Sequence, residues 1–182
     1  MERSDILNAL KEARNYVPIA EKQAFISACA TKCIDTVRIT ADGGVPAPDR
    51  YKVNVQRKDK YLLCALARLY LKLDIETEGE DPWLLSDAQY DTFAGMHLEG
   101  EIQRAKGDAS LRDRCFDLLG DYRSLRRRFD EEIVSLLAAL NDPISRIASF
   151  VYTIATPERM ERMISEIGTL LEQHQAENPK TE

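Results

Sequence analysis

Residues 111–140 read LRDRCFDLLGDYRSLRRRFDEEIVSLLAAL, and this stretch decides the fold. Apolar side chains recur in it at alternating steps of four and three residues, with one additional step of four. This spacing is typical of a long, nearly straight helix that buries one face. The buried positions are expected to be Leu111, Cys115, Leu118, Tyr122, Leu125, Phe129, Ile133, Leu136 and Leu140. Asn141-Asp142-Pro143 interrupts the pattern, so the sequence predicts one helix over 111–140.

A second decisive stretch is residues 57–73, with the sequence RKDKYLLCALARLYLKL. After Lys60 it is apolar on nearly every side, and only Arg68 and Lys72 interrupt it. A helix that is apolar all round is surrounded by other elements. We therefore expect this helix to lie at the centre of the core.

The remaining helices are predicted from apolar spacing and from helix-breaking residues, at 4–15, 18–35, 86–106, 143–154 and from Pro157 onward. Ser4 is expected to cap the helix at 4–15, and Ser86 with Gln89 forms a capping box for the helix at 86–106. Gly95 and Gly100 lie inside the helix at 86–106, where glycine costs about 1 kcal/mol relative to alanine. We expect these two glycines to permit close helix packing.

Residues 36–56 differ from the rest of the chain because apolar and polar residues alternate around the turn signal Asp42-Gly43-Gly44. This pattern predicts a small two-stranded hairpin, with an irregular loop as the alternative. The fold class is thus mainly α: a helical bundle of six or seven helices, a long heptad-patterned helix and one small hairpin.

The chain is expected to form a helical core domain, residues 1–155, followed by an amphipathic C-terminal helix, residues 156–182. That last helix has an apolar seam of Met160, Ile164, Ile167 and Leu171. An uncovered seam would expose a sizeable apolar strip. It should therefore pack on the long helix of its own chain or join two chains as a homodimer.

Composition agrees with a soluble helical protein: the chain has 182 residues, 44% hydrophobic and 31% charged, with only 8 glycines and 7 prolines. The net charge is −6, which disfavours a general nucleic-acid coat or a binder of anionic membranes. The charge is uneven along the chain. Residues 1–75 carry a net +4, residues 76–110 a net −7 and residues 111–182 a net −3.

Four cysteines, Cys29, Cys33, Cys64 and Cys115, fall in apolar, helix-like segments rather than in the spacing of a disulfide scaffold. The chain opens without a signal-peptide pattern. Its longest apolar run, Tyr61 to Ala67, is far shorter than the roughly 20 residues of a membrane span. We expect a cytoplasmic protein without membrane contact.

The sequence contains no phosphate-binding loop, dinucleotide fingerprint, nucleophile elbow, HExxH or paired CxxC motif. His97 and Glu101 are one helical turn apart, but two ligands do not complete a metal site. We therefore expect a protein that is not an enzyme, with no catalytic residues, no metal and no cofactor.

Acidic residues form the first candidate binding surface. They gather in the segment with the strongest negative charge and are Glu76, Glu78, Glu80, Asp81, Asp87 and Asp91. Asp113, Asp117 and Asp121 extend them as a ladder of like charge on the long helix. The simplest reading is a solvated face, and the functional reading is a surface that docks on a basic partner.

Basic residues form a second candidate surface, in two groups. One group is Arg123, Arg126, Arg127 and Arg128, where an acid follows each arginine of the triplet at i+4, so local pairing is the simplest reading. The other group lies beside the turn-rich segment and consists of Arg50, Lys52, Arg57, Lys58 and Lys60. Both groups are candidates for contact with nucleic-acid phosphates, and the second serves equally well to solubilise the start of a core helix.

Three segments resemble a group of small proteins from phages and bacterial mobile elements that includes a type II-A anti-CRISPR inhibitor. They are YVPIAEKQAFISACATKCID, RKDKYLLCALARLYL and QYDTFAGMHLEGEIQRAKGDASLRDRCFDLLGDYRSL, between about residues 16 and 125. The resemblance implies a non-enzymatic inhibitor in the bacterial cytoplasm that binds the RNA-guided type II effector nuclease and blocks DNA cleavage. It also implies some affinity for duplex DNA. The alternative is a helical DNA-associated or regulatory protein of a phage or mobile element.

Overall fold

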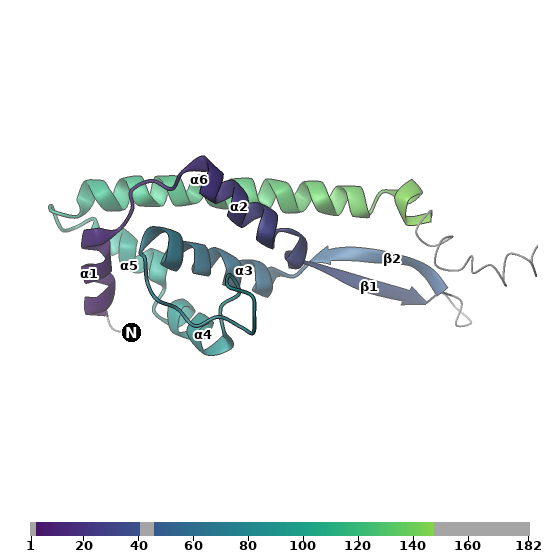
Figure 1. Ribbon diagram of the computed structural model, residues 1–182, viewed down its shortest axis with the longest axis horizontal. Coiled ribbons are helices and arrows are strands. Elements are labelled where there is room, and N and C mark those ends of the chain that lie inside the picture. The colour runs from purple at the N-terminus through teal and green to yellow at the C-terminus, as the bar shows by residue number, and fades with distance from the viewer. Residues whose placement is uncertain (1–2, 41–45, 148–182) are drawn as a thin grey trace, which may run out of the picture. The chain divides into compact units, whose positions relative to one another are not determined.

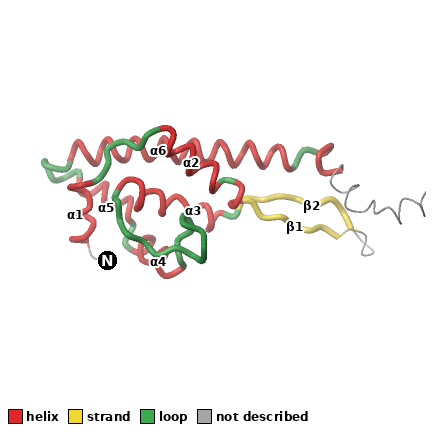
Figure 2. Tube along the Cα trace, viewed as in Figure 1, coloured by secondary structure: helices red, strands yellow, loops and turns green. Residues whose placement is uncertain are grey.

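The computed structural model describes residues 3–40 and 46–147 and is mainly helical, as predicted (Figures 1 and 2). Two strands, β1 (Ile34–Thr40) and β2 (Pro46–Val53), pair as a small antiparallel hairpin, which confirms the hairpin prediction. The helical elements in chain order are α1 (Arg3–Glu12), α2 (Ile19–Cys29), the 3₁₀ turn η1 (Thr31–Cys33), α3 (Val55–Ala65), the π-helix η2 (Leu66–Tyr70), α4 (Asp87–Gly95), α5 (Leu98–Ala105) and α6 (Arg112–Leu140).

The chain divides into two compact units. The first comprises residues 1–35 and 51–138, and the second comprises residues 36–50 and 139–182. The helix predicted from Pro157 onward and the end of the helix predicted at 143–154 lie outside the described residues.

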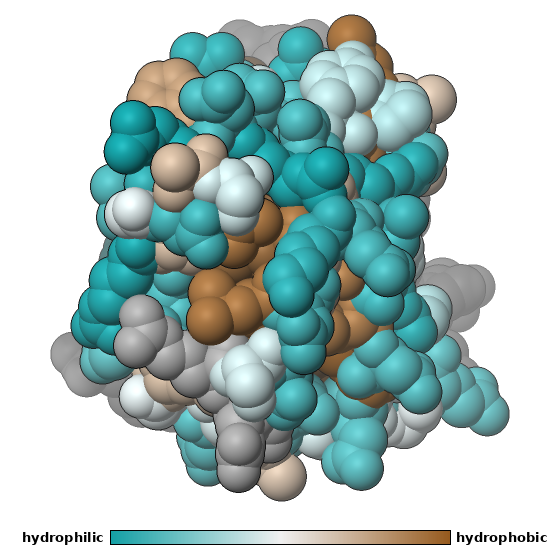
Figure 3. All heavy atoms as spheres, turned by 90° about the vertical axis from the view of Figure 1, so that its left-hand side faces the viewer, coloured by the Kyte–Doolittle hydropathy of each residue, from teal (hydrophilic) through white to brown (hydrophobic). Residues whose placement is uncertain are grey.

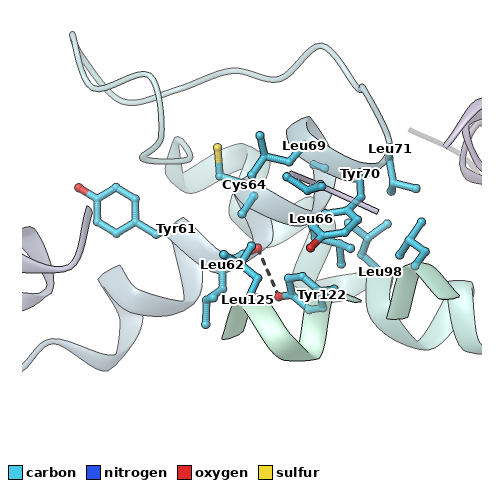
Figure 4. Close-up of a cluster of buried hydrophobic side chains, with 14 of the residues drawn as sticks. Tyr61, Leu62, Cys64, Leu66, Leu69, Tyr70, Leu71, Leu98, Tyr122 and Leu125 are labelled. Atoms are coloured by element: carbon cyan, nitrogen blue, oxygen red, sulfur yellow. Dashed lines mark hydrogen bonds between the residues drawn. The ribbon is translucent and has the colours of Figure 1, made fainter. Parts of the chain in front are cut away.

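The centre of the first unit is α3 with η2, as the sequence predicted for residues 57–73. From Lys60 to Leu71 every residue is buried except Leu63 and Arg68. Tyr70 packs edge-on against Tyr122 of α6 at 5.8 Å between ring centroids, and the Tyr122 hydroxyl donates to the Leu62 carbonyl (Figure 4). The core therefore forms where the apolar α3–η2 segment meets the seam of α6.

The long helix α6 has nearly the predicted bounds, and its seam is buried as expected. Its buried residues are Cys115, Leu118, Leu119, Tyr122, Leu125, Phe129 and Ile133. Leu136 is partly buried, and Leu140 at the end of the helix is 38% exposed. The predicted seam thus packs on the core over all but its last turns.

The single helix predicted at 86–106 is wrong, because the chain breaks between α4 and α5. His97 adopts a left-handed backbone conformation with φ of 50°, which ends one helix and starts the next. The expected role of the glycines is wrong as well: a Cβ on Gly95 would meet nothing within 4 Å, and one on Gly100 would meet only His97 at 3.5 Å. Half of the capping box predicted for Ser86 and Gln89 is confirmed: the Ser86 hydroxyl accepts from the Gln89 backbone N–H at 3.2 Å, but the Ser86 backbone N–H donates to the Glu76 carbonyl.

Two helices also differ from prediction at their ends. Ser4 lies inside α1 instead of capping it. The helix predicted at 18–35 ends at Cys29, because the residues after η1 include the β-branched Ile34, Thr36 and Val37, which favour a strand.

In the second unit, residues 143–147 form a short helical segment that begins after Asp142. The Asp142 carboxylate accepts from the Ser145 backbone N–H at 2.9 Å, which is an N-cap contact. Arg146 donates through Nε to the Asp49 carbonyl of β2 at 2.9 Å. This contact joins the hairpin to the segment that follows α6.

Candidate functional site

Three of the six residues of the predicted acidic surface, Glu78, Asp81 and Asp87, form ion pairs with lysines of the same chain. Lys60 on α3 is only 7% exposed, and its ammonium lies 3.0 Å from a Glu78 oxygen and 2.7 Å from an Asp87 oxygen. Burial lowers the pKa of Lys60, but the hydrogen bonds to Asp87 and Glu78 outweigh it, and the net shift is upward. Glu78 and Asp87 are therefore paired with a cation of their own chain.

Asp81 is the most strongly engaged of the six acids. Its carboxylate accepts from the Lys32 ammonium at 2.7 Å, the Tyr61 hydroxyl at 2.8 Å and the Trp83 backbone N–H at 3.0 Å. Burial raises the pKa of Asp81, yet these hydrogen bonds hold it below its ordinary value. The expectation that Asp81 is an exposed loop charge is wrong: it fastens the loop before α4 to η1 and α3. The other five acids of the segment, Glu76, Glu78, Glu80, Asp87 and Asp91, have exposed side chains.

The basic group beside the hairpin is also largely used within the fold. Arg57 donates to the Asp35 carboxylate at 3.1 Å and to the Lys32 carbonyl at 2.8 Å, and Lys58 pairs with Asp130 of α6 at 3.1 Å. Lys60 is buried, as described above. Only Arg50 and Lys52 of this group are exposed.

Of the six arginines of α6, the four candidates Arg123, Arg126, Arg127 and Arg128 are all exposed. Local pairing at i+4 occurs for Arg127, whose nearest contact to Glu131 is 3.7 Å, and Arg126 lies 3.8 Å from Glu99 of α5. Both distances exceed that of a hydrogen bond, so these exposed ion pairs contribute little to stability. The guanidinium donors stay accessible to another molecule. The i+4 pairing expected for Arg126 fails because Asp130 binds Lys58 instead.

The predicted acidic ladder on α6 separates into two kinds of residue. Asp121 is an internal hub: it accepts from the Lys22 ammonium at 2.5 Å, the Val17 backbone N–H at 3.0 Å and the Tyr70 hydroxyl at 2.9 Å. Asp113 and Asp117 are exposed, and no ion pair is found for either within residues 3–40 and 46–147. Only these two remain for an external partner.

The outer face of α6 carries a stripe of exposed residues, of which only Arg123 and Arg127 were candidates from the sequence. Its members follow one another at steps of 4, 3, 4, 4 and 3: Phe116, Gly120, Arg123, Arg127, Glu131 and Val134. The signal was present in the sequence, as a second periodic series on the helix that includes a glycine. The stripe was missed because its members differ in chemistry, whereas the buried seam is uniformly apolar.

Several hollows lie along this stripe, and two of them matter for its chemistry. The first, with a volume of about 440 Å³, is lined by Asn15, Tyr16, Phe116, Asp117, Gly120, Asp121 and Ser124. The second, of about 400 Å³, is lined by Arg123, Arg126, Arg127, Asp130, Glu131 and Val134. The outer face of α6 thus presents an aromatic and acidic band followed by an arginine band.

Figure 3 shows the first unit from the end at which α1 lies. The surface there is mostly hydrophilic, and polar side chains surround an apolar area. Nothing in this view marks a deep cavity.

The four cysteines are buried and free. Burial raises the pKa of the Cys33 and Cys64 thiols to about 12, and it also raises that of Cys29 and Cys115. Thiolate chemistry is therefore disfavoured at all four. Within the described part of the chain no group of three or more His, Cys, Asp or Glu side chains could hold a metal ion.

The chain matches no protein-family model, and it has no significant match among curated proteins or solved structures. None of the helices in the described ranges is both long enough and apolar enough to cross a bilayer.

Proposed function

We propose that this protein is a non-enzymatic inhibitor that binds the RNA-guided effector nuclease of type II CRISPR systems and blocks DNA cleavage, as its resemblance implies. The observation that supports it best is the outer face of α6, where an acidic band with Asp113 and Asp117 precedes the exposed arginines 123, 126, 127 and 128. The proposed binding surface is therefore on α6 and not, as expected from the sequence, on the acidic segment 76–91.

A nuclease loaded with guide RNA presents cationic side chains and anionic phosphates close to one another. Such proteins hold nucleic acid in positively charged channels, so protein cations and phosphates lie side by side along the channel. A helix face with an acidic band and a basic band complements that arrangement, with the carboxylates on the protein and the guanidinium groups on phosphates. Duplex DNA alone would leave the acidic band facing phosphates.

The second candidate is a DNA-associated or regulatory protein of a phage or mobile element. The exposed arginines of α6 favour it, because guanidinium groups that are not closely paired can release counterions from DNA phosphates. In this case the acidic band would take no part in binding.

The experiment compares variants of the two bands in a cleavage assay with guide-loaded nuclease and in a gel shift with duplex DNA across a salt series. The first variant replaces Arg123, Arg126 and Arg127 by glutamine, and the second replaces Asp113 and Asp117 by asparagine. A matched control replaces the exposed acids Glu76, Glu80 and Asp91 by the corresponding amides.

Inhibition should fall in both α6 variants and persist in the control. If only the arginine variant has an effect, and the wild-type chain binds duplex DNA with a steep salt dependence but not the nuclease, the second candidate is correct. Full inhibition by both α6 variants would contradict the proposed surface.

A further inference from the structure

The hollow at the N-terminal end of the α6 stripe is framed by two exposed aromatic rings. Tyr16, in the segment between α1 and α2, is 55% exposed, and Phe116 on α6 is 67% exposed. Both line the same hollow of about 440 Å³. Two large rings kept exposed around one hollow are typical of a surface that another molecule covers.

Gly120 lines this hollow and lies in the interior of the 29-residue helix α6. Glycine weakens a helix interior relative to alanine, yet a Cβ at this position would meet nothing within 4 Å. Packing within the described chain therefore gives no reason for a glycine here. A partner group that approaches the helix backbone between the two rings would give one.

The charged side chains around the hollow indicate whether the partner group that enters it is a cation or an anion. Asp117 lines it with an exposed carboxylate, and Asp113 lies one helical turn earlier on the same face. Asp121, at the rim, is already bound to Lys22. A carboxylate that lines an aromatic hollow attracts a cation and repels a phosphate.

The chain itself shows the same chemistry at the wall of the hollow. The Lys22 ammonium lies 4.8 Å from the centroid of the Tyr16 ring and 2.5 Å from an Asp121 oxygen. Lys106 lies over the Phe116 ring at 5.0 Å. Each ring thus holds one lysine of its own chain, and Asp121 neutralises Lys22. Among the described residues no ion pair is found for Asp117, which leaves its carboxylate for a further cation that enters the hollow.

We infer that the hollow between Tyr16 and Phe116 is a docking site for an arginine side chain of a protein partner. The guanidinium stacks on the exposed rings over Gly120 and donates to the Asp117 carboxylate. Arginine fits better than lysine because its planar group can stack and donate at the same time. This inference rests on the proposed function, since it names what the acidic band of α6 binds on the nuclease.

The test is an NMR titration of the full ¹⁵N-labelled chain with a blocked Gly-Arg-Gly peptide. The matched control peptide carries citrulline, which has nearly the same shape as arginine but no charge. The arginine peptide should shift the Gly120 amide saturably, and the citrulline peptide should bind about tenfold more weakly or worse. Asp117→Asn should weaken arginine binding by about tenfold.

Variants of Gly120 separate a lost site from a lost fold. Gly120→Ala should raise the melting temperature and weaken peptide binding, and Gly120→Leu should abolish binding in a folded chain. Val134→Ala is the matched control, because Val134 is 64% exposed on the same stripe but lies outside this hollow. It should bind the peptide like the wild type.

The inference is overturned if the arginine peptide gives no saturable shift at Gly120, or if citrulline binds equally well. It is also overturned if an oligothymidine shifts Gly120 and the arginine peptide does not, which would indicate stacked bases. If the Gly120→Leu variant no longer binds the peptide but still inhibits the nuclease fully, the hollow is not part of the interface with the nuclease. The assignment of the nuclease as the partner that supplies the arginine then fails. If the peptide binds as expected but the wild-type chain does not inhibit the nuclease, the arginine site stands and the proposed function fails.

Discussion

Replacing Asp121 by asparagine should destabilise the protein far more than the same change at the exposed residues Asp113 and Asp117 of the same acidic series. The carboxylate is the only charge partner found for Lys22 among the described residues, and Lys22 is 3% exposed. Breaking a buried pair by removing one partner costs about 3–5 kcal/mol, because the other charge stays buried. The asparagine amide would also oppose donors from Val17 and Tyr70.

The measurement is urea unfolding followed by far-UV circular dichroism. With a slope of about 2 kcal/mol per molar urea, a loss of about 3–5 kcal/mol lowers the midpoint by about 2 M. Asp117→Asn is the matched control, one helical turn earlier and exposed, and it should stay within about 0.5 kcal/mol of the wild type.

A double variant separates a lost ion pair from a general defect of the helix. Lys22→Met added to Asp121→Asn removes the unpaired buried ammonium, while the amide oxygen can still accept from the Val17 N–H or the Tyr70 hydroxyl, so this double variant should recover part of the stability lost in Asp121→Asn. The reasoning is refuted if Asp121→Asn and Asp117→Asn unfold at the same urea concentration with equal slopes.

Other predictions follow from the core, the thiols and the loop before α4. Leu66→Asp should leave the chain unfolded by circular dichroism, because Leu66 is fully buried at the centre of the core and a carboxylate there has no partner. All four cysteines should resist a thiol reagent at pH 8 in the native protein and react together in denaturant, and rapid native labelling of any one would show that it is not buried as described. The lowered pKa of Asp81 means that its contribution is complete above the unfolded value near pH 4 and is lost as the pH falls through the lower folded value. The urea midpoint should therefore fall below about pH 4, and it should fall less in Asp81→Asn; an equal fall in both would exclude Asp81 as a source of acid sensitivity.

The sequence was sufficient for the elements whose patterns are long and uniform. The seam of α6 repeats over 29 residues and the α3–η2 segment is apolar on all sides, so each could only be a buried helix. The break at His97 was not predictable from such patterns. A left-handed residue that is not glycine costs only a little, and tertiary packing can impose it where local preferences still favour one helix.

The functional surfaces were harder to predict because charge in a sequence does not show where its partner lies. Lys60 and Glu78 are 18 residues apart and Lys22 and Asp121 are 99 apart, so their pairing depends on the tertiary fold. The sequence therefore could not show that three of the six acidic candidates, Glu78, Asp81 and Asp87, pair with lysines of their own chain. The hollow at Tyr16 and Phe116 combines two segments that are distant in sequence, and only the structure brings them together.

If α6 is the proposed binding surface, its two charged bands also affect how a partner arrives. From Asp117 to Arg127 the helix rises about 15 Å, which is nearly twice the Debye length of about 8 Å at physiological ionic strength. An approaching molecule thus meets the carboxylates of the first band and the guanidinium groups of the second separately, each beside charges of the other sign, such as Arg112 and Glu131. A partner with its own charges in the complementary order experiences a torque that aligns it before contact, and one in the reverse order is turned away. The bands therefore select the orientation of the encounter, and added salt should slow association by weakening this alignment while leaving dissociation less affected.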